Sequence, residues 1–114
     1  MSLLSDLKSI LDGMSVPNRT GAYTDLPPDQ YVTLVPLSDE FDLYCDNAPS
    51  VDIEAVRISI YSKTNYNVLK KGIISALLVR DYTITDRHYV GYESDTKYHH
   101  YNVDVERCNE MEEE

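Results

Sequence analysis

The segment that decides the fold runs from residue 40 to residue 60. It reads Glu40-Phe-Asp-Leu-Tyr-Cys-Asp46, then Asn47-Ala-Pro-Ser50, then Val51-Asp-Ile-Glu-Ala-Val-Arg-Ile-Ser-Ile60. Apolar and polar residues alternate through the first part, which predicts a strand with one buried face. The residues at 47–50 are turn formers. Because a second apolar alternation follows directly, the whole segment predicts a β-hairpin.

The second strand of this hairpin changes phase. Its apolar residues occupy odd positions up to Ala55 and even positions from Val56 onward. Since side chains of a strand alternate between two faces, a shift of one residue exchanges the faces. We therefore expect a β-bulge or bend at Ala55-Val56. It would divide the hairpin into a base anchored in the core and a protruding arm whose apolar side faces elsewhere.

A short amphipathic helix is expected before the hairpin and a longer helix after it. The apolar residues of the first recur at helical spacing: Leu3, Leu4, Leu7, Ile10 and Leu11. Gly13 follows as a C-cap candidate. The second helix is expected to begin at Asn65 as its N-cap and to end near Arg80. Gly72 in its middle suggests close packing on the sheet. The residues expected to face the core are Leu69, Ile73, Ala76 or Leu77, and Leu78.

The remaining strands are short and separated by turn residues. They are expected at 31–35 (ended by Pro36), 82–86, 88–93 and 98–107, and residues 18–28 predict an irregular connection with a short strand at 22–24. This order predicts an α+β fold, with a mainly antiparallel sheet, two helices on one face and a protruding β-hairpin. Residues 1–108 are expected to form a single domain, and 109–114 an acidic disordered tail.

The charge of the chain is strongly negative and unevenly placed. Its 114 residues include 20 Asp and Glu against 10 Lys and Arg, a net charge of −10. No basic residue lies between Arg19 and Arg57. This acidity argues against nucleic-acid binding, which requires Lys and Arg. The acidic interval is either a solvated surface or a face that contacts a partner. Its candidate interface or lumen residues are Asp39, Glu40, Asp42, Asp46, Asp52 and Glu54.

The motifs of catalysis and cofactor binding are missing from the sequence. The four glycines form no phosphate-binding loop, and no GxSxG, CxxC or HExxH motif occurs. Adjacent residues on a strand point to opposite faces, so His99 and His100 are not expected to ligate one metal ion. Neither an apolar run long enough for a membrane span nor a signal peptide is evident. We therefore expect a cytosolic protein that is not an enzyme, uses no cofactor, contacts no membrane and binds other proteins.

The order and spacing of several stretches resemble a family. They are Leu3 to Asp12, Tyr31-Val-Thr-Leu-Val-Pro36, Phe41-Asp-Leu-Tyr-Cys-Asp-Asn47, Val56-Arg-Ile-Ser-Ile-Tyr-Ser-Lys63, Tyr82-Thr-Ile-Thr-Asp-Arg87 and Tyr98-His-His-Tyr-Asn-Val-Asp-Val105. Together they cover nearly the whole chain, which resembles the tail-completion or tail-terminator proteins of long-tailed phages and prophages of low-GC Gram-positive bacteria. None of the stretches is a catalytic signature, and the family has no active-site residues to transfer.

The resemblance implies a structural role in the virion tail or neck, after assembly in the host bacterial cytoplasm. Such proteins form rings, commonly hexamers, that cap the tail tube and dock it to the head connector. The implied partners are therefore other copies of the chain, the tail-tube protein and the head–tail connector protein. Two alternatives remain open at this point. One is a neck or head-completion protein, and the other is a monomeric acidic binding module that inhibits a partner or imitates nucleic acid.

Overall fold

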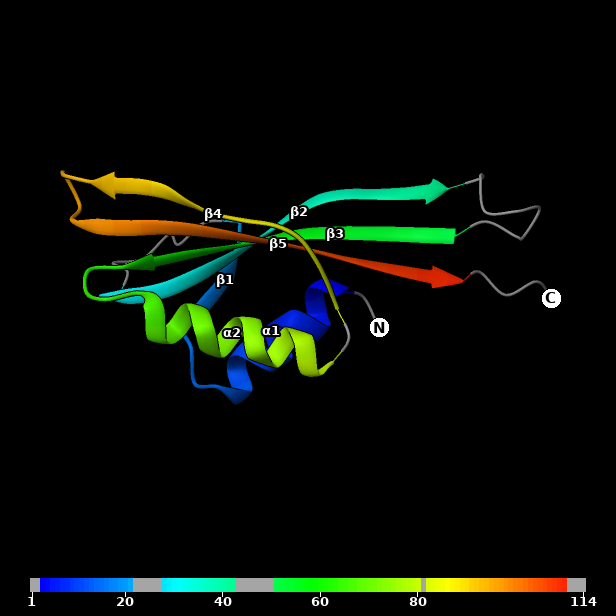
Figure 1. Cartoon of the computed structure of the whole chain (residues 1–114), viewed down its shortest axis with the longest axis horizontal. Helices are drawn as coiled ribbons and strands as arrows, with labels where there is room; N and C mark the ends of the chain where they lie inside the picture. The colour runs from blue at the N-terminus through cyan, green and yellow to red at the C-terminus, as the bar shows by residue number, and fades with distance from the viewer. Residues whose placement is uncertain (1–2, 22–27, 43–50, 81, 111–114) are drawn as a thin grey trace.

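The computed structural model describes residues 3–21, 28–42, 51–80 and 82–110 (Figure 1). The elements are, in chain order, α1 (Leu3–Gly13), β1 (Asn18–Thr20), β2 (Gln30–Asp42), β3 (Val51–Ser62), α2 (Asn67–Val79), β4 (Thr83–Glu93) and β5 (Tyr98–Glu110). The strands form one sheet in the order β1-β2-β3-β5-β4. The β1–β2 pair is parallel, and the other neighbouring pairs are antiparallel. The predicted α+β fold with a mainly antiparallel sheet is confirmed.

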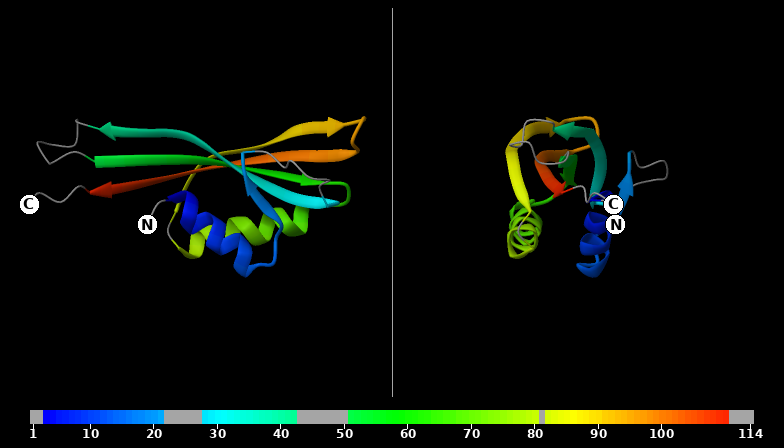
Figure 2. Two further views of the ribbon diagram at one scale, coloured as in Figure 1. Left: turned by 180° about the vertical axis from the view of Figure 1, so that it is seen from behind. Right: turned by 90° about the vertical axis from the view of Figure 1, so that its right-hand side faces the viewer.

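Both helices cover the same face of the sheet, as predicted (Figure 2). Their apolar stripes meet the apolar residues of β2, β3 and β5 in one core, because alternate positions of these strands point toward the helix layer. The largest fully buried side chains of this core are Leu3, Leu7, Leu11, Val32, Leu34, Ile58, Ile60, Ile73, Leu77, Val103 and Val105. The opposite face of the sheet carries no helix among the described residues, and we call it the open face.

The left-handed residue that closes the first helix lies two positions later than predicted. Ser15, and not Gly13, adopts the left-handed conformation, with φ of 61°. The backbone N–H of Val16 donates to the carbonyl of Leu11 at 3.0 Å, and that of Ser15 donates to Asp12 at 3.0 Å. This pair of bonds is the Schellman motif that closes a helix C-terminus.

The second helix differs from the prediction in three details. Its N-cap residue is Tyr66, although Asn65 still accepts a hydrogen bond from the backbone N–H of Asn67 at 2.9 Å. A Cβ at Gly72 would lie 3.3 Å from the terminal methyl of Met14, so this glycine packs near the end of α1 and not on the sheet. Leu78 was expected in the core but is 58% exposed, because the buried stripe passes through Leu77 instead.

The predicted bulge exists, but in the neighbouring strand. The register of β3 against β5 is continuous, whereas that of β2 against β3 shifts between Pro36 and Ser38, directly opposite Ala55 and Val56. Leu37 is therefore the extra residue. Pro36 does not end β2, because β1 pairs only as far as Leu34 and leaves Pro36 on an edge that needs no N–H donor.

Three strand boundaries also differ from those expected. Residues 18–20 form β1, and the short strand expected at 22–24 lies outside the described residues. The two strands expected at 82–86 and 88–93 are one strand, β4, whose register against β5 shifts between Ile84 and Asp86 and again between Tyr89 and Gly91. Strand β5 continues to Glu110, past the expected start of the tail, and residues 111–114 lie outside the described part.

The strands β2, β3 and β5 extend well past the helix layer (Figure 1). The molecule is consequently elongated, with principal extents of 51 × 26 × 25 Å. We call this extension the arm, and it consists of residues 38–42, 51–55 and 106–110. The predicted hairpin forms two of its strands, since Asp42 pairs with Val51, and β5 adds a third because Glu110 also pairs with Val51. The turn predicted at 47–50 lies outside the described residues.

Candidate functional site

The predicted acidic site gathers on two neighbouring strands. Asp39, Glu40 and Asp42 lie in β2, while Asp52 and Glu54 lie in β3. These strands are directly paired, with Asp39 opposite Glu54. The structure thus brings these residues together in the arm, as the hairpin prediction required, and Asp46 lies outside the described residues. Glu54 is the member of this set whose side-chain contacts are described.

Glu54 has a role within the chain. Its Oε2 accepts a hydrogen bond from the backbone N–H of Leu3 at 3.0 Å, and its Oε1 lies 3.3 Å from Nη2 of Arg107. Arg107 also donates to Asp6 of α1. The three charged side chains are only about one fifth exposed, at 19% for Glu54, 21% for Arg107 and 23% for Asp6. Burial opposes the charged guanidinium, but the bonds from both carboxylates raise the pKa of Arg107 overall.

This network joins the start of α1 to the base of the arm. A carboxylate at a helix N-terminus is stabilised by the free N–H groups and by the helix dipole. The partners come from α1, β3 and β5, so the network fixes the arm relative to the helix layer. Glu54 is therefore an anchor within the chain, and the other acidic residues of the arm remain the candidates for contact with a partner or a lumen.

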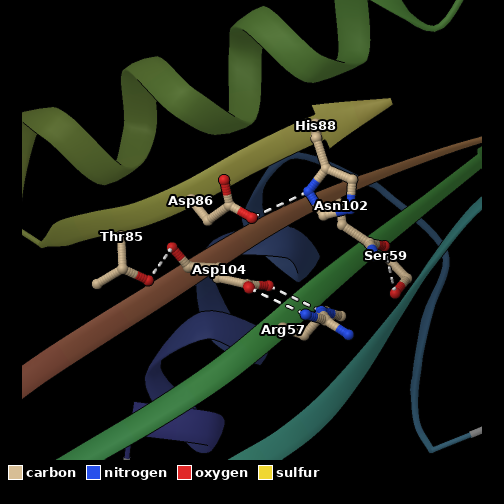
Figure 3. Close-up of polar contacts among 7 residues, drawn as sticks. All are labelled: Arg57, Ser59, Thr85, Asp86, His88, Asn102 and Asp104. Carbon is tan, nitrogen blue, oxygen red and sulfur yellow. Dashed lines mark hydrogen bonds and ion pairs between the residues drawn. The ribbon is translucent and has the colours of Figure 1, made fainter. Parts of the chain in front are cut away.

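The open face carries a ladder of polar side chains (Figure 3). Arg57 of β3 makes two hydrogen bonds with Asp104 of β5, at 2.9 and 3.1 Å. One position along the same face, Ser59 donates to Asn102 at 3.0 Å. The hydrogen bond with Asp104 is the main cause of a raised pKa for Arg57. A bidentate pair of this kind fixes the register of two strands.

The edge strand β4 continues this ladder. The hydroxyl of Thr85 donates to the backbone carbonyl of Asp104 at 3.4 Å, and His88 lies 3.0 Å from Asp86 (Figure 3). The central polar side chains of the ladder are buried even though no described helix covers them: Thr33, Ser59, Asn102 and Asp104. Because Ser59 bonds Asn102 and Arg57 bonds Asp104 across the β3–β5 pair, the ladder serves to stabilise the sheet.

Aromatic rings cover one end of the open face. Tyr61 stacks on Tyr31 at 4.8 Å and on His100 at 4.3 Å between ring centroids, and Tyr98 packs edge-on against Tyr31 at 5.3 Å. Burial raises the pKa of Tyr61 and lowers the pKa of His100. The hydroxyl of Tyr98 donates to the carbonyl of Pro28 at 2.7 Å. These rings behave as a second small core.

The neighbouring histidine faces the other side of the sheet. His99 lies 2.9 Å from the hydroxyl of Tyr89 and 4.8 Å from the ring of Tyr92, on the side of the helices. The prediction that His99 and His100 point to opposite faces is thus confirmed. Among the described residues, no group of three His, Cys, Asp or Glu side chains is arranged to hold a metal ion.

The outer face of α2 is a surface that sequence reasoning missed. Val68, Leu78 and Val79 are 80%, 58% and 80% exposed, and together with Lys71 they form a stripe at helical spacing on the side away from the sheet. The sequence offered one sign of this surface, a separation of charge: residues 63–80 contain four Lys and Arg residues and no Asp or Glu. In the part of the chain that is described, no helix is both long and apolar enough to cross a membrane.

Comparison of the sequence with protein-family models found no match, and comparison with curated proteins found no significant similarity. The features of the molecule that bear on its function are therefore the arm, the open face and the outer face of α2, together with the resemblance described above.

Proposed function

We propose that this chain is a structural protein of a phage or prophage virion that completes the tail. It would form a ring of identical copies, cap the tail tube and dock the tube to the head connector, with no catalytic role. Its place would be the tail or neck of the virion, after assembly in the host bacterial cytoplasm. The observation that carries the proposal is the arm, since a three-stranded extension beyond the helix layer offers contacts that a monomer does not use.

The polar chemistry of the chain is consistent with this role. The ladder on the open face and the network around Arg107 bond mainly within the chain, so they stabilise a rigid sheet. A ring requires a heterologous contact, in which one patch binds a different patch of the next copy. An elongated molecule with an arm at one end provides two such separated patches.

The acidity would suit a ring through which a genome passes. Carboxylates repel the phosphate backbone over a distance of roughly 8 Å at physiological salt, whereas Lys and Arg would retain it. The lumen candidates are Asp39, Glu40, Asp42, Asp46 and Asp52, because Glu54 is bound within the chain. If a ring solved by electron microscopy places these residues on its outer wall, the lumen role is refuted. Ring formation itself would not be contradicted by that result.

The proposal is tested by the assembly of the purified chain with the tail-tube protein from the same gene neighbourhood. We expect rings by negative-stain electron microscopy and a higher mass by light scattering, either alone at high concentration or on tubes. A chain that stays monomeric under both conditions and binds no tube protein would contradict the proposal. The alternative, a monomeric acidic inhibitor, would then be favoured by the acid-rich arm, and it predicts stoichiometric capture of a basic partner.

A further inference from the structure

Both edges of the arm lack a neighbouring strand in the part of the chain that the structure describes (Figure 1). Strand β1 covers the outer edge of β2 only as far as Leu34, and β4 covers that of β5 only as far as Glu106. Residues 38–42 of β2 and 108–110 of β5 each pair with β3 on one side, and no described strand lies on the other. A strand edge of this kind presents backbone N–H and C=O groups to which a further strand can bind.

The other edges of the sheet are less suited to such binding. Strand β1 is only three residues long. No described strand lies outside β4, but the register of β4 against β5 shifts at two places, and bulges disturb the regular spacing that a second strand needs. In the arm, by contrast, the register of β2 against β3 continues without interruption from Ser38 to Asp42. The arm therefore carries the regular open edges of this sheet.

The hydrogen bonds beside β1 show which backbone groups point outward from β2. The N–H of Val32 and the C=O of Leu34 bond residues next to β1, so even-numbered residues of this part point their backbone groups away from β3. Leu37 is one extra residue, and it exchanges odd and even positions beyond the bulge. Asp39 and Phe41 therefore point their N–H and C=O groups to the open edge.

The open edge of β5 matches that of β2 in spacing and direction. The backbone groups of Asp39 point away from Glu54, so those of Glu54 point to Arg107, its opposite residue on β5. Cys108 and Glu110 then present their N–H and C=O groups at the open edge. Because β2 and β5 are both antiparallel to β3, they run in the same direction. A second copy can therefore place its β5 edge beside this β2 edge as a parallel pair, with the open face continuous across both copies.

Resting on the proposed function, we propose that the β2 edge of the arm pairs with the β5 edge of a second copy of this chain. The contact is heterologous, as a ring requires, because the two edges are different patches. Each copy carries one edge of each kind, so a closed ring leaves no edge of the arm unpaired. A strand from an unrelated protein would cover one edge and leave the other open, which is why a second copy is the better occupant.

The outward groups match when Glu40 lies opposite Cys108 of the second copy. In a parallel pair, each outward residue bonds the residues before and after its opposite. The N–H of Phe41 then donates to the C=O of Cys108, and the C=O of Asp39 accepts from the N–H of Cys108. The C=O of Phe41 accepts from the N–H of Glu110.

A proline substitution tests the backbone pairing. Phe41→Pro removes an N–H that points outward and keeps the bonds of β2 to β3, so the chain should fold. Its self-association should weaken by at least about tenfold in sedimentation velocity. The matched control is Phe41→Ala, which also removes the ring but keeps the N–H, and it should lose less than threefold, on the order of one rim contact. The assays are run in 1 M NaCl, where a Debye length of about 3 Å screens the carboxylates of the arm. Circular dichroism checks that each variant is folded.

A disulfide tests the register independently. Directly opposite residues of neighbouring strands are about 4.8 Å apart, which a disulfide can bridge. With Cys45→Ser in each chain, Glu40→Cys should form an intermolecular disulfide with Cys108 under mild oxidation. Asp39→Cys removes the same charge but lies on the other face of the strand, so it should not. Adding Cys108→Ala to Glu40→Cys should abolish the disulfide.

The outcomes separate this inference from the proposed function. Rings that form on tail tubes, are insensitive to Phe41→Pro and give no disulfide with Glu40→Cys would overturn the edge pairing while the proposed function stands. A disulfide that forms equally with Asp39→Cys, or that survives Cys108→Ala, would also overturn it, because random collision or contact between two β2 edges would then explain the link. A chain that contacts no second copy, alone or with tube protein, would overturn both.

Discussion

Replacement of Arg107 by methionine tests whether the ionic network holds the arm to the helix layer. The change keeps much of the side-chain volume but leaves Asp6 and Glu54 facing each other without a cation. Removing one member of a buried ion pair costs about 3–5 kcal/mol. These side chains are 19–23% exposed, and solvent screens part of the repulsion, so we expect a loss of about 2–4 kcal/mol.

The assay is urea unfolding followed by circular dichroism, at a concentration where the chain is monomeric. The urea concentration at the midpoint of unfolding should fall. The slope of the free energy of unfolding against urea concentration should stay constant, because only stability changes. The double variant Arg107→Met/Glu54→Gln should lose less than the sum of its two single variants, since the uncompensated charge is relieved. Arg80→Met, which changes the exposed arginine at the C-cap of α2, is the control and should stay within about 0.5 kcal/mol of wild type. A loss below about 1 kcal/mol for Arg107→Met would refute the reasoning.

Three further predictions concern the core, a titrating group and a helix end. Ile73→Ala removes a core side chain that is 1% exposed and should cost about 2–5 kcal/mol in the same urea assay. His100 has a pKa below its ordinary 6.5 because it is buried, so the unfolded chain binds more protons and stability should fall as pH drops below 6.5. His100→Gln should flatten this dependence in pH-resolved melts, and the exposed His88→Gln should retain it. Ser15→Gly should raise the melting temperature by an amount equivalent to about 0.5–1 kcal/mol, because glycine adopts φ of 61° without strain.

The parts of the fold that were predicted correctly are those encoded by local periodicity. Leu3, Leu7 and Leu11 define a helix face by their spacing alone, and the structure buries all three. The hairpin was equally predictable, because alternation on both sides of a turn requires no distant information. The open-face ladder was not, since Arg57 and Asp104 are 47 residues apart and only the sheet register brings them together.

The position of the bulge could not be predicted from the sequence of one strand alone. A phase change in β3 indicates that something must adjust near Ala55, but either partner strand can supply the extra residue. The structure adjusts β2 at Leu37, next to Pro36, where β2 has passed the end of its pairing with β1 and is an edge strand. The role of Glu54 was hidden for a similar reason, because its partners Leu3 and Arg107 are 51 and 53 residues away.

The continuous register of β3 has a consequence for the arm. Glu54 points toward α1, so Ile53 and Ala55 on either side of it point to the open face. Val56 and Ile58 lie on the same face as Glu54 and enter the core. The apolar residues of β3 thus change faces at the point where the helix layer ends. A strand evolved only to close the core would have no reason to move its apolar positions to a face that no described helix covers. A strand that also contacts a neighbouring copy would have such a reason, so this distribution of apolar residues is consistent with the proposed assembly.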